Sequence, residues 1–208
     1  MNRLERRKCD ICGKLIQPFG YMKLSDGNMC TDCAKLLSPM LKNRQGADVD
    51  YIKRHVEYRK ENEKKLKQFN PVTRYGYDKK IYIDSKMFAF LVTNKLEKDI
   101  AAGNPDIIPL VQVKSCETEI REHTPKGVSE DDVSKDVSLY DFIVTVKLES
   151  EWFDEIVVSL NGERIRGRDN RIYKKCESDA KQLKDTLMPD QSFSASIPER
   201  KSHNVYRL

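Results

Sequence analysis

The sequence predicts an α+β protein in two parts, a small cysteine-rich module and a larger region of strands that ends in one helix. The first observation is a matched pair of Cys-x-x-Cys motifs, Cys9 with Cys12 and Cys30 with Cys33, near the N-terminus. The second is a change near Val72 from helical periodicity to the two-residue alternation of strands. The strand-like region continues until an amphipathic segment over residues 171–187.

The four cysteines predict one metal site. A two-residue gap lets both sulfurs of a tight turn face the same ion, and residues 13–29 are long enough for a hairpin that brings the second pair round. Zinc binds four thiolates tetrahedrally, with Zn–S distances of ~2.3 Å. The sequence therefore predicts one structural Zn²⁺ per chain, held by Cys9, Cys12, Cys30 and Cys33. Four thiolates fill the coordination sphere and leave no position for a catalytic water.

Three other uses of the cysteines compete with zinc. A disulfide framework suits an oxidising compartment, but residues 1–8 show no apolar segment after their charges, so no export signal is indicated. A redox dithiol needs one Cys-x-x-Cys pair, and here there is a matched second pair. Iron would use the same four ligands, so iron and thiol chemistry stay open as alternatives.

Local signals around the cysteines predict a treble-clef or zinc-ribbon finger over residues 1–45. Asp26 and Gly27 form a hairpin-turn dipeptide between the two cysteine pairs, and a short helix is expected after Cys33. A finger of this size has a very small core. Metal binding would therefore supply its folding free energy.

A connecting helix is predicted within residues 46–71. Asp48 is suited to the N-cap position, and Pro71 ends the helix. Apolar residues are sparse along it, and residues 59–65 are polar on every side. This composition favours an exposed connector, with a basic nucleic-acid face as the alternative.

The pattern of residues 72–188 predicts a pleckstrin-homology-like β domain. Seven strand-like runs are expected, at residues 72–77, 80–84, 87–92, 107–113, 114–122, 138–149 and 154–161. The helix that follows carries an apolar stripe of Ile172, Cys176, Ala180, Leu183 and Leu187. Seven strands and a packing helix are the order of elements in a pleckstrin-homology-like seven-stranded β-barrel with a C-terminal helix. Residues 189–208 are expected to form a flexible tail.

The chain resembles a small bacterial zinc-finger family described as a domain of unknown function. The resemblance begins with residues 9–14, 24–27 and 30–39, which include all four cysteines. It continues over residues 58–59, 69–70, 83–84, 104–108 and 153–156, so that it spans about residues 8–188. It implies a zinc site followed by a pleckstrin-homology-like binding module, and it implies no activity.

Composition and motifs argue against several functions. The longest strongly apolar run, residues 87–92, is far too short to cross a bilayer. The three histidines, His55, His123 and His203, lie in no recognisable nucleophile pattern, and no glycine-rich phosphate loop follows a strand. We therefore expect a cytoplasmic, non-enzymatic protein with no small-molecule substrate.

Charge is unevenly distributed along the chain. Residues 1–70 hold 16 Lys and Arg against 9 Asp and Glu, while the whole chain has a net charge of +5. A second basic cluster, which we call the arginine loop, comprises Arg164, Arg166, Arg168 and Arg171. Four guanidinium groups in eight positions are suited to bind phosphates, an acidic peptide or lipid headgroups.

These observations predict a zinc-stabilised adaptor that binds another protein. The first alternative is nucleic-acid binding through the basic N-terminal half, because a positive charge there favours phosphate contacts. The second alternative is attachment to an anionic membrane through the arginine loop. The identity of the protein partner does not follow from the sequence.

Overall fold

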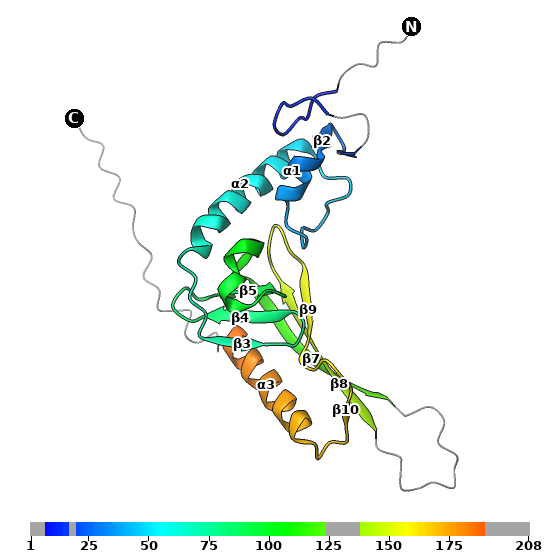
Figure 1. Ribbon diagram of the computed structural model, residues 1–208, viewed down its shortest axis with the longest axis vertical. Helices are drawn as coiled ribbons and strands as arrows, with labels where there is room; N and C mark the ends of the chain where they lie inside the picture. The colour runs from blue at the N-terminus through cyan, green and yellow to red at the C-terminus, as the bar shows by residue number, and fades with distance from the viewer. Residues whose placement is uncertain (1–6, 17–19, 124–137, 190–208) are drawn as a thin grey trace, which may run out of the picture.

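A computed structural model describes residues 7–16, 20–123 and 138–189, and in this part the chain has an α+β fold (Figure 1). The cysteine-rich module contains β1 (Tyr21–Lys23), β2 (Asn28–Cys30) and the short helix α1 (Thr31–Leu36). The helix α2 (Val49–Leu66) follows and leads into two antiparallel sheets. The described part closes with α3 (Arg171–Leu187). No helix in these residues is long and apolar enough to cross a membrane.

The first sheet has the order β3-β4-β5-β6, formed by Thr73–Tyr75, Lys80–Asp84, Ala89–Thr93 and Ile107–Pro109. Both of its faces are covered, which explains why residues 89–92 are all apolar and all buried. Ile83 and Phe90 face the main core. Leu91 and Tyr82 face a second cluster, which is completed by Leu66 of α2.

The second sheet is built around the long strand β8 (Leu139–Leu148). β7 (Val113–His123) pairs with one edge of β8, while β9 (Glu155–Ser159) and the short β10 (Ile165–Arg166) pair in succession along the other edge. Side chains of β8 alternate as the sequence predicts, with Tyr140, Phe142, Val144, Val146 and Leu148 buried.

Each of the seven expected strand-like runs overlaps a strand, but the two sheets remain open. Within the described residues no pair of strands joins one sheet to the other. One backbone hydrogen bond, from the Tyr77 N–H to the Ser159 carbonyl (2.9 Å), links the turn after β3 to β9. The closed pleckstrin-homology-like barrel is therefore not confirmed.

The helix α3 packs on the second sheet through a stripe that differs at one position from the expected stripe. Cys176, Ala180, Leu183 and Leu187 are buried as predicted, but Ile172 is 56% exposed and Tyr173 takes its place. The Tyr173 ring contacts the rings of Tyr140 and Phe142 edge-on, at centroid distances of 5.1 and 4.9 Å. Ile172 lies four residues before Cys176 and Tyr173 lies three residues before it, and both spacings place a side chain on the same face of a helix, so periodicity alone does not choose between them.

The helix α2 is not exposed on all sides, which corrects the expectation for residues 59–65. Its N-cap is Asp48 as predicted, and the carboxylate accepts a hydrogen bond from the Tyr51 N–H (2.6 Å). However, Arg59 and Asn62 are buried, with 8% and 1% of their surface exposed. They face the segment that precedes β6, and their polar atoms bond to it. A polar residue can thus be buried where a neighbouring segment supplies matching hydrogen-bonding groups.

The tip of the β8–β9 hairpin also docks on α2. Trp152 is buried there among Tyr51, His55 and Tyr58, with ring-centroid distances of 4.9–5.7 Å. The Lys42 N–H donates to the Trp152 carbonyl (2.9 Å), which ties the chain between α1 and α2 to the same tip.

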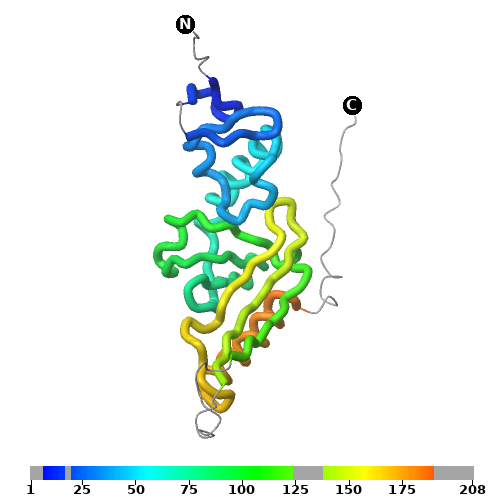
Figure 2. Tube along the Cα trace, turned by 90° about the vertical axis from the view of Figure 1, so that its right-hand side faces the viewer, coloured from blue at the N-terminus to red at the C-terminus, as the bar shows by residue number. Residues whose placement is uncertain are grey.

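One contiguous cluster of buried side chains runs from the cysteine module through α2 to the second sheet and α3. The module and α2 lie at the same end of the elongated molecule, against the first sheet and the hairpin tip (Figure 2). The division into residues 1–45, 46–71 and 72–188 stays a prediction, although buried contacts cross both boundaries. The tail expected at residues 189–208 lies outside the described residues, apart from Pro189.

Truncation of Leu183 to alanine should strongly destabilise the protein. Leu183 is fully buried, and leucine-to-alanine changes at such sites cost roughly 2–5 kcal/mol. Gln182, the adjacent exposed residue, should tolerate alanine within about half a kcal/mol. Urea unfolding of the full chain measures both values, and similar losses for the two variants would contradict the packing of α3.

Candidate metal centre

The first pair of cysteines lies on a tight turn that follows residues 7–8. The Cys9 N–H donates to the Lys14 carbonyl and the Gly13 N–H to the Cys9 carbonyl, both at 2.8 Å. Gly13 has φ of 74°, in the left-handed region that a residue without Cβ enters readily. The turn thereby places Cys9 and Cys12 on the same side.

The second pair lies where β2 ends and α1 begins. Cys30 is the last residue of β2 and also the N-cap of α1, where its sulfur accepts a hydrogen bond from the Cys33 N–H (3.5 Å). The Cys30 N–H in turn donates to the Cys9 sulfur at 3.3 Å. Two chain segments therefore approach each other around the sulfurs.

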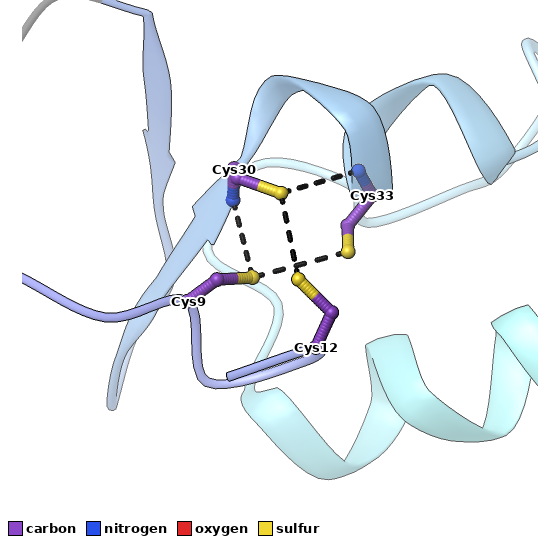
Figure 3. Close-up of side chains that lie close together, drawn as sticks. All are labelled: Cys9, Cys12, Cys30 and Cys33. Carbon is purple, nitrogen blue, oxygen red and sulfur yellow. Dashed lines mark hydrogen bonds between the residues drawn. The ribbon is translucent and has the colours of Figure 1, made fainter. Parts of the chain in front are cut away.

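The four sulfur atoms form a compact group, as Figure 3 shows. All four lie within 4.8 Å of one another. The Cys9–Cys33 and Cys12–Cys30 sulfur distances are 3.9 and 3.8 Å. A tetrahedron with metal–sulfur bonds of ~2.3 Å has edges of about 3.8 Å, so the sulfurs stand close to the spacing that a tetrahedral metal requires.

The charge state of the sulfurs also favours a cation. Burial disfavours ionisation of Cys9, but N–H donors of Cys30, Cys12 and Ile11 outweigh it and bring its pKa to about 7. Burial and the neighbouring thiols raise the pKa of Cys33. Thiols packed this closely cannot all ionise unless a positive charge lies among them.

Gly27 allows the hairpin to pack closely against its surroundings. A Cβ at this position would lie 2.7 Å from the Asp10 carboxylate and from the Val49 side chain. The Asp10 carboxylate accepts the Asn28 N–H (2.7 Å), and the Asp26 carboxylate accepts the Val49 N–H (2.8 Å). The hairpin predicted at Asp26 and Gly27 thus joins the metal centre to the start of α2.

The arginine loop is partly neutralised by carboxylates. The Arg164 Nε lies 3.5 Å from Asp141, and the Arg168 guanidinium lies 3.2 Å from Glu122 and over the Tyr140 ring. Arg166 and Arg171 are exposed. Two of the four guanidinium groups thus lie against carboxylates, and anion binding by the arginine loop stays a prediction.

Sequence reasoning missed a buried polar network between the cysteine module, α2 and the segment before β6. Arg59 donates to Asp106 (2.7 Å), and the Ser38 hydroxyl donates to the other oxygen of Asp106 (2.5 Å). Both ends of the ion pair are buried, with side-chain exposures of 9% and 1%. Burial raises the pKa of Asp106, although Arg59 and Ser38 act in the opposite direction. The resemblance over residues 104–108 was the one signal in the sequence that pointed to this segment.

His55 belongs to the same interface. It is fully buried, and its Nε2 accepts a hydrogen bond from the Ser38 N–H (3.1 Å). Its Nδ1 has no hydrogen-bond partner in the described part of the chain, and the ring meets the Trp152 ring edge-on at 4.9 Å. Burial, with Arg59 and Arg44 nearby, lowers the His55 pKa to about 4. His55 is therefore neutral at pH 7 and unsuited to accept a proton.

The remaining candidates lie apart from the metal centre. Cys116 and Cys176 are buried in the main core, where burial raises the pKa of each thiol. His123 ends β7, and its Nε2 lies 2.9 Å from Asp141. No other group of three or more metal-ligating side chains is found in residues 7–16, 20–123 and 138–189.

Comparison with known proteins supports the first part of the resemblance only. Residues 8–55 match a family model described as "Domain of unknown function (DUF4428)". The match includes all four cysteines and the first turns of α2, and it covers less than half of the chain. No curated protein and no solved structure matches the chain.

Purified protein should contain about one zinc ion per chain, because the four sulfurs are arranged for one tetrahedral metal. Cys30→Ser removes a thiolate and should release the metal, whereas Cys116→Ser changes a buried thiol elsewhere and should retain it. Elemental analysis of the three proteins measures this. Metal-free wild type, or full metal content in Cys30→Ser, would refute the assignment, and iron in place of zinc would correct it.

Acidification below pH 6.5 should destabilise the protein through His55. Its folded pKa of about 4 lies below the ordinary value of 6.5, so between these limits the unfolded chain binds a proton that the folded chain does not. Protonation of His55 in the unfolded chain should lower the free energy of unfolding by about 2 kcal/mol between pH 7 and pH 5. Urea unfolding at both pH values should show that loss in wild type beyond the loss in His55→Gln, whose side chain does not titrate. Equal losses would show that His55 contributes nothing.

Proposed function

We propose that this protein is a zinc-stabilised, non-enzymatic adaptor that binds another protein in the cytoplasm. The observation that carries the proposal is the closed set of four thiols, of which Cys9, Cys30 and Cys33 are buried. A metal with four thiolate ligands has no open position for a substrate or water. The role of such a metal is then structural, because it holds the surrounding protein surface in a fixed conformation.

The same proposal includes a fold assignment for each part. The order of turn, hairpin, second cysteine pair and short helix supports a treble-clef or zinc-ribbon finger. Two antiparallel sheets followed by α3 support a pleckstrin-homology-like region. Both assignments rest on the order of the elements, and a fold of this kind supports a binding role by analogy alone.

Polar groups in the described residues support a binding role more than catalysis. His55 is buried and neutral, and the Ser38 hydroxyl donates to Asp106 instead of to a histidine. His123 hydrogen-bonds to Asp141, and none of its hydrogen-bond partners in the described residues is a nucleophile. All six cysteines are free thiols, and four of them are grouped so that they could bind one metal ion.

The structure gives little support to the two alternatives. Two of the four lysines of α2 pair with glutamates of the same helix, Lys60 with Glu57 and Lys64 with Glu61. In the arginine loop, Arg164 and Arg168 lie against carboxylates. A phosphate or lipid headgroup would have to displace these partners.

Reconstitution with a purified partner tests the proposal. The tagged full chain should retain a specific protein from cells that express it, and the purified pair should bind saturably at ~0.15 M salt. Duplex DNA, RNA and phosphatidylserine vesicles serve as competing probes, with Arg166→Glu as the matched variant for vesicles. Tight nucleic-acid binding that weakens steeply with salt, or vesicle binding that Arg166→Glu abolishes, without a protein partner, would replace the adaptor proposal.

A further inference from the structure

Several contacts that dock the cysteine module on the rest of the protein come from the chain just after α1. The Ser38 N–H donates to His55 Nε2 of α2 (3.1 Å), and the Ser38 hydroxyl donates to the Asp106 carboxylate before β6 (2.5 Å). The Lys42 N–H in turn donates to the Trp152 carbonyl at the tip of the β8–β9 hairpin (2.9 Å). Ser38 is fully buried in this interface. One short stretch of chain thus contacts three separate parts of the fold.

The position of this stretch depends on two of the metal ligands. α1 has only 6 residues and begins directly at the metal centre, where the Cys30 sulfur caps it by accepting the Cys33 N–H at 3.5 Å (Figure 3). Helices this short are unstable in water on their own, because so few hydrogen bonds do not offset the cost of nucleation. A metal bound to the Cys30 and Cys33 sulfurs would fix the first turn of α1 and thereby place Ser38 for docking.

The helix α2 is held on the first sheet by contacts that do not involve the module. The Asn62 side chain accepts the Ile107 N–H and donates to the Pro105 carbonyl, both at 2.7 Å. Leu66, the last residue of α2, is buried in the second cluster together with Leu91 of β5. No described residue of the cysteine module belongs to that cluster. α2 therefore keeps these contacts if the module leaves.

The second sheet and α3 also have a core of their own. Phe142 and Val144 of β8 and Leu183 and Leu187 of α3 are at most 1% exposed. The Tyr173 ring of α3 meets the Phe142 ring edge-on at a centroid distance of 4.9 Å. Burial of these apolar side chains holds the helix on the sheet. Release of the module would leave these contacts in place.

We propose that the metal centre acts as a conformational switch that controls whether the cysteine module covers α2 and the hairpin tip. In the metal-bound protein α1 is formed, and Ser38 and Lys42 are docked. In the metal-free protein this stretch is released, which uncovers Asp106, His55 and Trp152 while α2, both sheets and α3 stay folded. The surface that the protein presents then differs between the two states. The inference rests on the zinc site of the proposed function and adds a form of regulation to it.

Hydrogen exchange of the full chain tests the switch, with the metal present and after its removal by EDTA under reducing conditions. The amides of Ser38 and Lys42 should exchange at least about fivefold faster in the metal-free protein, because their acceptors in α2 and in the hairpin are lost. The amides of Ile107 and Leu160, which donate to groups of α2 and β8, should keep their protection. Added Zn²⁺ should restore slow exchange at Ser38 and Lys42.

Two results of this experiment would overturn the switch. Unchanged exchange at Ser38 and Lys42 would show that docking needs no metal. Faster exchange at Ile107 and Leu160 as well would show that the whole fold depends on the metal, so that no surface is uncovered selectively. Elemental analysis measures the metal in each sample, and a wild-type chain that neither contains nor binds zinc would refute the metal site together with the switch.

Reciprocity between the two events gives a second test. If a bound metal strengthens docking, then loss of a docking contact must weaken metal binding by the same factor. Ser38→Ala removes the hydroxyl bond to Asp106, although Ser38 is not a ligand, and should lower the zinc affinity about fivefold or more in competition with a chromogenic chelator. Ser25→Ala, at an exposed serine of the same module, is the matched control and should bind zinc like wild type.

The outcomes separate this inference from the proposed function. Circular dichroism verifies that both serine variants are folded. Equal zinc affinities for Ser38→Ala and wild type would overturn the switch and leave the metal site and the adaptor function standing. The adaptor function fails only if reconstitution finds no protein partner, a result that does not alter exchange or zinc affinity.

Discussion

The buried ion pair between Arg59 and Asp106 is the contact on which the relative position of the three parts depends. Arg59 comes from the middle of α2, Asp106 from the segment before β6, and Ser38 adds a hydrogen bond from the cysteine module. Removal of one partner from such a pair costs roughly 3–5 kcal/mol, because the other is left as an uncompensated buried charge. The ion pair by itself is therefore weak evidence that the fold is stabilised. It nevertheless strongly constrains how α2 packs against the segment before β6.

The two sheets differ in how the backbone of an edge strand is covered, and α2 causes the difference. The Asn62 side chain accepts the Ile107 N–H and donates to the Pro105 carbonyl, both at 2.7 Å, and the Tyr58 hydroxyl lies 3.5 Å from the Ile107 carbonyl. Side chains of a helix thus take the place of a neighbouring strand along β6. β7 has no such cover in the described residues, and its outer edge is open there.

The metal centre and this interface support each other. The cysteine module contributes Leu37 and Leu41 to the cluster that includes Trp152 and Phe153, so part of its core belongs to the β8–β9 hairpin. A bound metal would order the module, and the ordered module would then present Ser38 to His55 and Asp106. For this reason we expect metal binding to be coupled to the docking of the cysteine module on α2 and on the segment before β6.

The sequence by itself determined the features that depend on local spacing. Two Cys-x-x-Cys pairs indicate a four-thiolate site, alternation in residues 139–148 indicates a half-buried strand, and Asp48 indicates a helix start. Only the tertiary structure decided what depends on a distant partner. In the sequence Arg59 and Asn62 resemble solvent-exposed residues, but in the fold they are buried against the segment before β6. Tyr173 occupies the position expected for Ile172 because its ring packs against the rings of Tyr140 and Phe142. Arg168 lies against Glu122, which is distant in the sequence. Periodicity describes one element at a time, whereas burial of a polar group is decided by the element that packs against it.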